Sequence, residues 1–438
     1  MVEVRRTWCG ELRLYVECYG CPANRSDLEL MISLARRHFR NLELVNNPNE
    51  ADILVVHTCA VKSPTEARML SRIKALANIG KPLIVSGCIY LISPKSVMKL
   101  VKDLSCSIIT PHSIGRFPYA CELALKGGIS VVKEYSPISI HKSFRMNPLI
   151  EIVAISNGCK FACSFCCVRF ARGALLSRPL VSILKQVREA VADGIKEVWL
   201  TSQDTASYLY RHYQLPDLVK EVANVPGDFM IRVGMMNPSS ATLVLNGLVE
   251  AVSHEKVYNF IHLPLQSGSD KVLADMNRTY SVADFLELAR LFREKLQCTI
   301  ATDVIVGYPT ESESDFNDTL AVIEEVKPDV LNISRYGHRP LTPASTLKQL
   351  DPQVVKRRVK KLLAVFRKAA MEQNAQYVGE VVEALIVEEG PRGGLIARTR
   401  SYKPIVVDAP SSALGRWCEV RVEGCAPTYL KGTVLRLK

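Results

Sequence analysis

Residues 156–173 read SNGCKFACSFCCVRFARG, a stretch that holds Cys159, Cys163 and Cys166 in a Cys-x3-Cys-x2-Cys spacing. Three thiolates this close together can bind three irons of a cubane iron–sulfur cluster and leave the fourth iron without a protein ligand. A substrate or cosubstrate can bind at such an open iron. A zinc site or three buried core thiols are the alternatives, but zinc sites usually pair two x2 spacings, with a fourth ligand nearby that is not evident here. The spacing therefore predicts a cluster.

The sequence on both sides of this loop alternates between strand-like and helix-like runs. Six strand-like runs, from IEIVAIS at 150–156 to DVLNIS at 329–334, are separated by segments such as VSILKQVREAVADG. This alternation predicts a partial (β/α)6 barrel over 149–373, with its site on the loops that follow the strands. A satisfied buried polar group is the alternative for any single residue there. His262 is expected to be a core residue or to support a neighbouring ligand-binding residue, and not to be a ligand itself. Polar candidates for the site stand at the strand ends: Gln203, Asp204, Asn237 and Arg335.

A second set of cysteines lies within residues 1–126. Strand-like runs LRLYVE, ADILVVH and PLIVSG alternate with helix-like segments and lead into Cys21, Cys59 and Cys88 in turn. The alternation predicts a doubly wound parallel sheet, in which loops at the carboxyl ends of strands share one edge. We therefore expect these three thiols to converge on a second cluster with an open iron, although any one of them alone reads as an ordinary buried residue. Four further cysteines are expected to be structural: Cys9, Cys18, Cys106 and Cys121. Cys18 is also a possible spare thiol near the site.

The end of the chain has a different pattern. Residues 374–438 contain five short β-rich runs separated by Gly and Pro, which predicts a small OB-like barrel, a fold that often binds RNA. A structural cap on the central barrel is the alternative. Residues 127–148, which begin with two glycines, are expected to be a linker.

The charge of the chain favours an anionic partner. Its net charge is +12 and its pI is about 9, so nucleic acid is the first expectation and a membrane surface the second. Residues 353–368 carry seven Lys or Arg and no acid on a helix-like pattern, which is either a solvated face or a phosphate-binding strip. The candidate phosphate contacts lie on this segment and in the β-rich block: Lys356, Arg357, Arg358, Lys360, Lys361, Arg398, Arg400 and Lys403.

The compartment follows from what the sequence lacks. No run of eighteen apolar residues and no apolar signal-peptide core is visible, so we expect neither a membrane span nor export. Fourteen cysteines without an export signal favour a reducing compartment and metal ligation, and we expect a cytoplasmic protein.

Taken together, these motifs resemble the methylthiotransferase family of radical S-adenosylmethionine (SAM) enzymes over nearly the whole chain. The N-terminal block contributes YGCPANRSD, HTCAV and SGC, and the centre contributes NGCKFACSFC, LTSQDTASY, RVGMMNP, IHLPLQSGSD, DVIVGYP and NISRYGHRP. The terminal runs ARTRSYKPIVVD and YLKGTVLRL are similar to the RNA-binding TRAM domain of that family. The match is most similar to the archaeal and eukaryotic branch, which methylthiolates N6-threonylcarbamoyladenosine beside the tRNA anticodon.

The resemblance implies two 4Fe–4S clusters, SAM used in two ways, and tRNA as substrate. Cys159, Cys163 and Cys166 are then expected to hold the cluster that cleaves SAM, and the N-terminal triad the auxiliary cluster that carries the transferred sulfur. Gln203 and Asn237 are expected to recognise the ribose or methionine part of SAM. Asp204 and Arg335 are expected to orient charged parts of SAM or the threonyl carboxylate. An electron donor and a sulfur source are implied as further partners.

The sequence departs from the family pattern at three places, and other substrates stay open. Cys167 replaces an aliphatic residue, Leu341 stands where glycine is expected, and TESES follows DVIVGYP in place of GET. The alternative substrates are isopentenyladenosine in tRNA and an aspartate of a ribosomal protein. A non-catalytic iron–sulfur RNA-binding protein is the alternative from another class.

Overall fold

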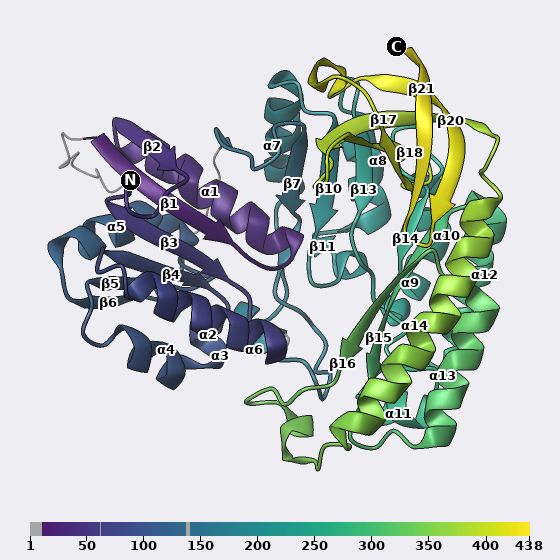
Figure 1. Ribbon diagram of the computed structural model, residues 1–438, viewed down its shortest axis with the longest axis horizontal. Helices are drawn as coiled ribbons and strands as arrows, with labels where there is room; N and C mark the ends of the chain where they lie inside the picture. Colours follow the sequence, from purple (N-terminus) through teal and green to yellow (C-terminus); the bar gives the residue numbers. More distant parts are fainter. Residues whose placement is uncertain (1–10, 62, 137–140) are drawn as a thin grey trace. The chain divides into compact units, whose positions relative to one another are not determined.

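The computed structural model describes residues 11–61, 63–136 and 141–438 (Figure 1). The chain forms two compact units. The first, here the N-terminal unit, comprises Met1–Met146, Asn157–Leu176 and Gly337–Ser345. The second, here the barrel unit, comprises Asn147–Ser156, Ser177–Tyr336 and Thr346–Lys438. The cysteine loop at 157–176, which we expected within the barrel, therefore groups with the N-terminal unit.

The N-terminal unit is built on a six-stranded, all-parallel sheet in the order β2-β1-β3-β4-β5-β6. Apolar side chains of β3 alternate between two cores, since Leu54 and Val56 lie in one and Ile53 and Val55 in the other. Helices cover both faces, as in a doubly wound fold, which confirms the predicted class. The strands are β1 (Glu11–Cys18), β2 (Asn41–Val45), β3 (Ile53–Thr58), β4 (Leu83–Gly87), β5 (Cys106–Ile109) and β6 (Ile129–Val132). The helices are α1 (Pro22–His38), α2 (Ser63–Ala77), α3 (Ile89–Ile92), α4 (Pro94–Val101), α5 (Phe117–Lys126) and α6 (Val168–Arg172).

The expected linker at 127–148 is partly structured. Its first part contains β6, which pairs with β5 as an edge strand of the sheet. Lys142 is also buried, and its ammonium donates to Glu29 of α1 at 2.9 Å. Part of this stretch, 137–140, lies outside the described residues. The segment therefore belongs to the N-terminal unit through β6 and Lys142.

The barrel unit contains the six predicted parallel strands as two three-stranded sheets, β13-β10-β7 and β14-β15-β16. An isolated parallel bridge from Ile231 to Val257 links them, so the partial barrel is confirmed. Its strands are β7 (Ile150–Ala154), β10 (Glu197–Thr201), β13 (Met230–Val233), β14 (Phe260–His262), β15 (Thr299–Val306) and β16 (Val330–Arg335). Its helices are α7 (Leu180–Ala192), α8 (Leu215–Ala223), α9 (Pro238–Leu243), α10 (Leu245–Val252), α11 (Asp270–Asp275), α12 (Val282–Leu296), α13 (Glu313–Val326) and α14 (Pro352–Ala375). Two two-residue strands complete it, β11 (Leu209–Tyr210) and β12 (Tyr213–Gln214). The two-residue strands β8 (Ser156–Asn157) and β9 (Leu176–Ser177) stand where the chain passes from one unit to the other.

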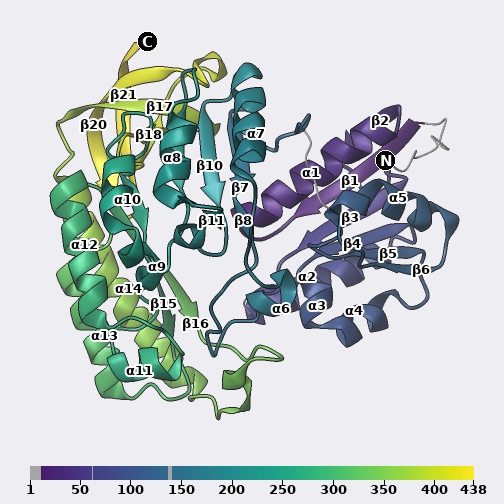
Figure 2. The same ribbon diagram turned by 180° about the vertical axis from the view of Figure 1, so that it is seen from behind.

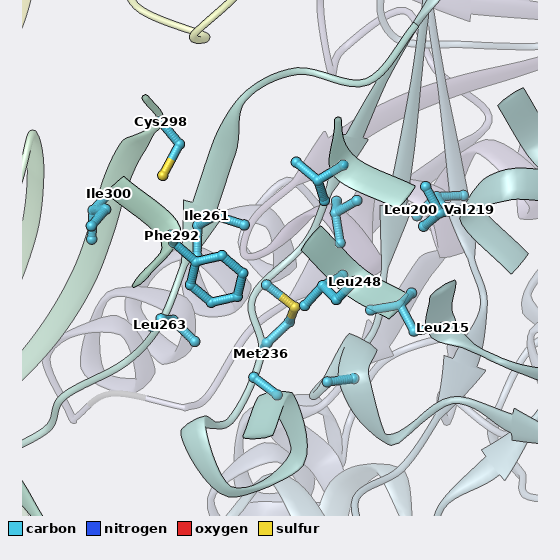
Figure 3. Close-up of a cluster of buried hydrophobic side chains, with 14 of the residues drawn as sticks. Leu200, Leu215, Val219, Met236, Leu248, Ile261, Leu263, Phe292, Cys298 and Ile300 are labelled. Carbon is cyan, nitrogen blue, oxygen red and sulfur yellow. The ribbon is translucent and has the colours of Figure 1, made fainter. Parts of the chain in front are cut away.

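One apolar core joins the strands of the barrel to the helices around them (Figure 3). Leu200 of β10 and Ile261 of β14 face Leu248 of α10 and Phe292 of α12 in this cluster, and all four are fully buried. The strands are short and mostly buried on both faces, as expected where helices cover a parallel sheet.

The C-terminal strands of the barrel unit close into a small barrel in the order β17-β18-β19-β21-β20 (Figure 2). Its strands are β17 (Val381–Glu389), β18 (Leu395–Thr399), β19 (Pro404–Val407), β20 (Trp417–Ala426) and β21 (Tyr429–Leu437). This confirms the predicted small barrel. Leu385 and Val387 of β17 share a core with Met230 and Phe260, which begin β13 and β14. The small barrel therefore packs against the amino-terminal ends of the central strands.

The described helices lack membrane-spanning character. In the part of the chain that the structure describes, none combines the length and the apolar sequence that crossing a bilayer requires.

Candidate cluster sites and nucleic-acid surface

The N-terminal cysteines follow three strands that are neighbours in the sheet. Cys21 caps α1 just after β1, Cys59 follows β3, and Cys88 follows β4. The register pairs Cys18 with His57 and Thr58 with Gly87, so these strands end nearly level with each other. Cys59 and Cys88 are buried and Cys21 is exposed. The predicted strand-end arrangement is thus present, while iron ligation by these thiols stays a prediction.

Local packing draws the Cys21 loop against Cys59. Gly20 has a φ of +118°, and a Cβ placed there would lie 2.8 Å from the Cβ of Cys59, so both conformation and space require glycine. The amide Nδ2 of Asn24 donates to the backbone carbonyls of Tyr19 and Thr58, each at 2.9 Å. This amide ties the loop after β1 to the end of β3.

The second cysteine loop packs on the same edge. The buried thiol of Cys167 lies 3.7 Å from the carbonyl oxygen of Ala60, directly after Cys59. Cys167 and Ala171 belong to one apolar core with α2, α3 and α4. The cysteine that departs from the family pattern therefore fills a core position beside the N-terminal triad.

Arg172 is the polar link between the two cysteine loops. Its side chain is buried, and Nη2 donates to Asp27 Oδ2 at 2.6 Å and to Asn24 Oδ1 at 2.7 Å. Burial alone would lower the pKa of Arg172, but the Asp27 carboxylate and the Cys88 and Cys21 thiols raise it above its ordinary value. A permanent cation from the second cysteine loop therefore lies close to Cys21 and Cys88 of the N-terminal triad.

The thiols of both triads fit a cluster in donor chemistry. Burial raises the pKa of Cys88 and of Cys166 to about 12, so each must lose its proton when it becomes a ligand. Among the described residues, no three His, Cys, Asp or Glu side chains are grouped around one point as ligands of a single metal ion. A cubane binds each cysteine to a different iron, so its thiolates need not meet at one point. The Arg172 cation adds a counter-charge for an anionic cluster.

The barrel unit positions the other candidates at the carboxyl ends of its strands. Gln203 follows β10, and its buried Oε1 has no hydrogen-bond partner among the described residues. Arg335 ends β16 and is exposed. His262 contacts Asp303 through Nε2 at 3.0 Å and is half-buried, in agreement with a supporting role.

Asp204 and Asn237 are used inside the protein. The Asp204 carboxylate accepts the backbone N–H of Asn237 at 2.9 Å, the hydroxyl of Ser240 at 2.7 Å, and the hydroxyl of Ser207. Asn237 caps α9, and its Oδ1 accepts the N–H of Ser239 at 3.2 Å. The Asp204 carboxylate and the Asn237 Oδ1 thus already accept hydrogen bonds within the protein, and direct contact of these residues with SAM stays a prediction.

Three of the predicted phosphate contacts are buried and paired with carboxylates, so they do not belong to an exposed phosphate-binding strip as we expected. Arg358 donates to Glu311 at 2.6 Å and to Glu313 at 3.0 Å. Lys403 donates to Asp329 at 2.7 Å. Arg398 pairs with Glu197 of β10 and Glu388 of β17. These cations join elements of the barrel unit and are not part of an exposed basic face.

The other basic residues form an exposed face of α14, here the α14 basic face. Lys356, Arg357, Lys360 and Lys361 are exposed, and two further cations that our prediction omitted lie on the same helix: Arg367 and Lys368. The charge run at 353–368 already contained both, and only the focus on its first half excluded them. Arg400 is also exposed but pairs with Glu383 at 3.3 Å.

Comparison with known proteins decides the family. Models for the radical SAM superfamily, the uncharacterized protein family UPF0004 and the TRAM domain match residues 153–323, 13–108 and 375–435. The chain is 41% identical to a probable threonylcarbamoyladenosine tRNA methylthiotransferase of Methanothermobacter thermautotrophicus, over 96% of this chain and 99% of that one. It is 33% identical to the threonylcarbamoyladenosine tRNA methylthiotransferase of Danio rerio, over 97% and 79%. The chain belongs to this family of methylthiotransferases.

Membership confirms the expected class of radical SAM enzyme, with 4Fe–4S clusters and SAM as cofactors. Among solved structures, the radical S-adenosylmethionine methyltransferase TsrM from Kitasatospora setae is similar with a TM-score of 0.55. It is 14% identical and covers 88% of this chain and 80% of its own, so it supports the fold.

Proposed function

We propose that this methylthiotransferase modifies C2 of N6-threonylcarbamoyladenosine at position 37 of tRNA, giving the 2-methylthio derivative. The observation that carries the proposal is the joint presence of both cysteine triads in one compact unit. The names of the full-length relatives support the substrate. We further propose that the protein works in the cytoplasm with an electron donor and a sulfur source.

The two cysteine triads would have different roles in the reaction. When bound, the clusters supply reductive SAM cleavage at Cys159, Cys163 and Cys166 and the transferred sulfur at Cys21, Cys59 and Cys88. The protein holds both cysteine loops on one sheet edge through Asn24, Asp27 and Arg172. This arrangement supports short transfer distances, which favour reaction of a substrate radical over its loss to solvent.

We propose that Gln203 contributes directly to SAM binding. A buried acceptor without a partner costs stability unless a ligand satisfies it, and Gln203 Oε1 is such an atom. The amino group or a ribose hydroxyl of SAM can donate to it. Arg335 has an exposed guanidinium, which suits the carboxylate of SAM or of the threonyl group.

We propose that tRNA contacts the α14 basic face. Lys356, Arg357 and Lys360 are exposed, and adjacent turns of one helix present them. Phosphate contacts of this kind supply affinity without reading sequence. The choice of nucleoside would then rest with the cavity that receives an extruded adenosine.

Mass spectrometry of tRNA nucleosides tests the proposed function. Cells that lack the chain, complemented by wild type or by Cys163→Ala, should show the 2-methylthio product only with wild type. The matched control is Cys106→Ala, a buried cysteine in β5 away from both triads. Methylthiolated isopentenyladenosine, or a methylthiolated ribosomal-protein aspartate in place of the expected nucleoside, would reject the substrate while keeping the chemistry.

A further inference from the structure

The barrel unit contains a polar cavity at the end of its strands opposite to Gln203 and Arg335. Its volume is about 200 Å³. The cavity lies at the start of β15 and before β16, between the end of α12, the end of α14 and the turn after β18. Its wall includes six polar side chains: Arg293, Thr299, Asp329, Gln373, Tyr377 and Lys403. The catalytic proposal uses none of these side chains.

Two polar atoms in this wall have no partner among the described residues. One is Oγ1 of Thr299, which is 3% exposed as a residue, and the other is Nε of Arg293. A buried donor without an acceptor is costly, so such atoms usually bind water or a ligand. Both atoms belong to residues that line one cavity, so we expect a ligand there to complete their hydrogen bonds.

The charges of the wall select the kind of ligand. Asp329 is the carboxylate there, and both of its oxygens are taken: Lys403 donates to Oδ1 at 2.7 Å, and Arg293 to Oδ2 at 3.3 Å. The backbone N–H of Ile300 also donates to Oδ2 at 2.9 Å. Two cations thus face one saturated carboxylate, which leaves a net positive charge. A cavity with surplus positive charge and unpartnered donors favours an anion over a neutral or cationic ligand.

We propose that this cavity is a binding site for a small oxyanion of the phosphate class. Arg293 Nε and the Thr299 hydroxyl would donate to its oxygens, and Lys403 would supply charge. The ligand would join α12, β15, α14 and the small C-terminal barrel in a single network. The phosphate group would come either from a free ion or from the backbone of bound RNA. The proposal does not depend on the substrate assigned above.

Calorimetric titration of the reconstituted full-length protein with sodium phosphate, at constant ionic strength in chloride, tests the site. Wild type should bind one phosphate in a saturable way. Thr299→Val and Arg293→Gln should each weaken binding at least about ten-fold, the effect of losing a hydrogen bond to a charged group. Arg290→Gln on the same helix is exposed and removes the same charge, so it should leave the affinity within about two-fold of wild type.

Stability measurements guard against a folding artefact. Thr299→Val removes a buried hydroxyl that has no partner, so in phosphate-free buffer it should unfold no earlier than wild type. Absence of saturable phosphate binding to wild type, or equal affinity in Thr299→Val and wild type, would overturn the proposal. If saturating phosphate weakens tRNA binding, the phosphate group in the cavity comes from the RNA backbone. If tRNA binding is unchanged, the ligand is the free ion.

Discussion

At the scale of single residues, Arg172 shows how one side chain can hold two sequence motifs together. It is 145 residues from Asp27 and 148 from Asn24 along the chain, yet it donates to both. A buried ion pair adds little over an apolar pair of the same shape, but breaking one partner is expensive. Its importance therefore lies in the order it imposes on the two cysteine loops.

We expect Arg172→Gln to lower the free energy of unfolding by about 3–5 kcal/mol, because Asp27 would be left buried without a partner. Arg172→Lys keeps the charge but loses the two-pronged geometry of the guanidinium, so its free energy of unfolding should lie between those of Arg172→Gln and wild type. Urea unfolding and iron content after anaerobic reconstitution measure the effects, and iron should fall at both triads. Arg169→Gln, on the exposed side of α6, is the control. Equal stability of Arg172→Gln and the control would contradict this role.

Leu341 illustrates a backbone cost at a single position. Its φ is +70°, a left-handed conformation that costs about 1–2 kcal/mol for a residue with a Cβ, and its side chain is 60% exposed. Glycine, the residue that the family pattern leads one to expect, relieves this cost but loses more entropy on folding. We expect Leu341→Gly to keep or raise stability and Leu341→Val to be about 1–2 kcal/mol less stable than Leu341→Gly.

The control for Leu341 is Leu347→Gly. Leu347 is 38% exposed and is not among the described residues with positive φ, so glycine there should cost stability. Thermal unfolding of the four proteins, including wild type, gives the comparison. If both glycine variants lose the same stability, the left-handed conformation at Leu341 is not a cost.

At the scale of elements, α14 separates basic residues by face. Arg358 lies on the stripe formed by Val355, Leu362 and Phe366 and is buried with them, whereas Lys356 and Lys360 point away. Helical spacing of three and four residues accounts for the difference, since 355, 358, 362 and 366 follow one face. A run of positive charge is therefore a binding face only where periodicity leaves it exposed.

We expect the double variant Lys356→Gln with Lys360→Gln to weaken tRNA binding. Each lost phosphate contact should reduce the log–log dependence of affinity on salt by about one unit. Binding titrations at several salt concentrations measure the slope. Arg290→Gln with Lys295→Gln, two exposed cations on α12, removes the same charge and should change the slope much less. Equal losses in the two double variants would mean that tRNA responds to net charge alone.

At the scale of the whole molecule, the small C-terminal barrel shares its stability with the central barrel. Arg398 is buried between Glu197 of β10 and Glu388 of β17, and its guanidinium lies over the rings of Trp199 and Tyr402. Removal of residues 374–438 would expose this network and the core around Phe260. Point substitutions therefore test RNA binding more cleanly than truncation.

We expect Arg398→Ala to lower the free energy of unfolding by about 3–5 kcal/mol, because Glu197 would stay buried with a charge and no cation. Arg400→Ala, two residues along the same segment, removes an exposed pair with Glu383 and should cost less than about 1 kcal/mol. Urea unfolding of both variants measures the difference. A small loss for Arg398→Ala would show that the two barrels are stabilised separately.

The sequence by itself determined the fold class and the cysteine positions. Alternating strand and helix periods recur in each block, and each N-terminal strand runs directly into its cysteine, so local pattern was sufficient for Cys21, Cys59 and Cys88. The structure decided what depends on contacts between distant residues. Asp204, Arg398 and Lys403 are all polar at promising positions, but each pairs with a residue 33, 201 or 74 positions away in the chain, respectively. Burial of a polar side chain depends on those partners, and the local sequence pattern does not identify them.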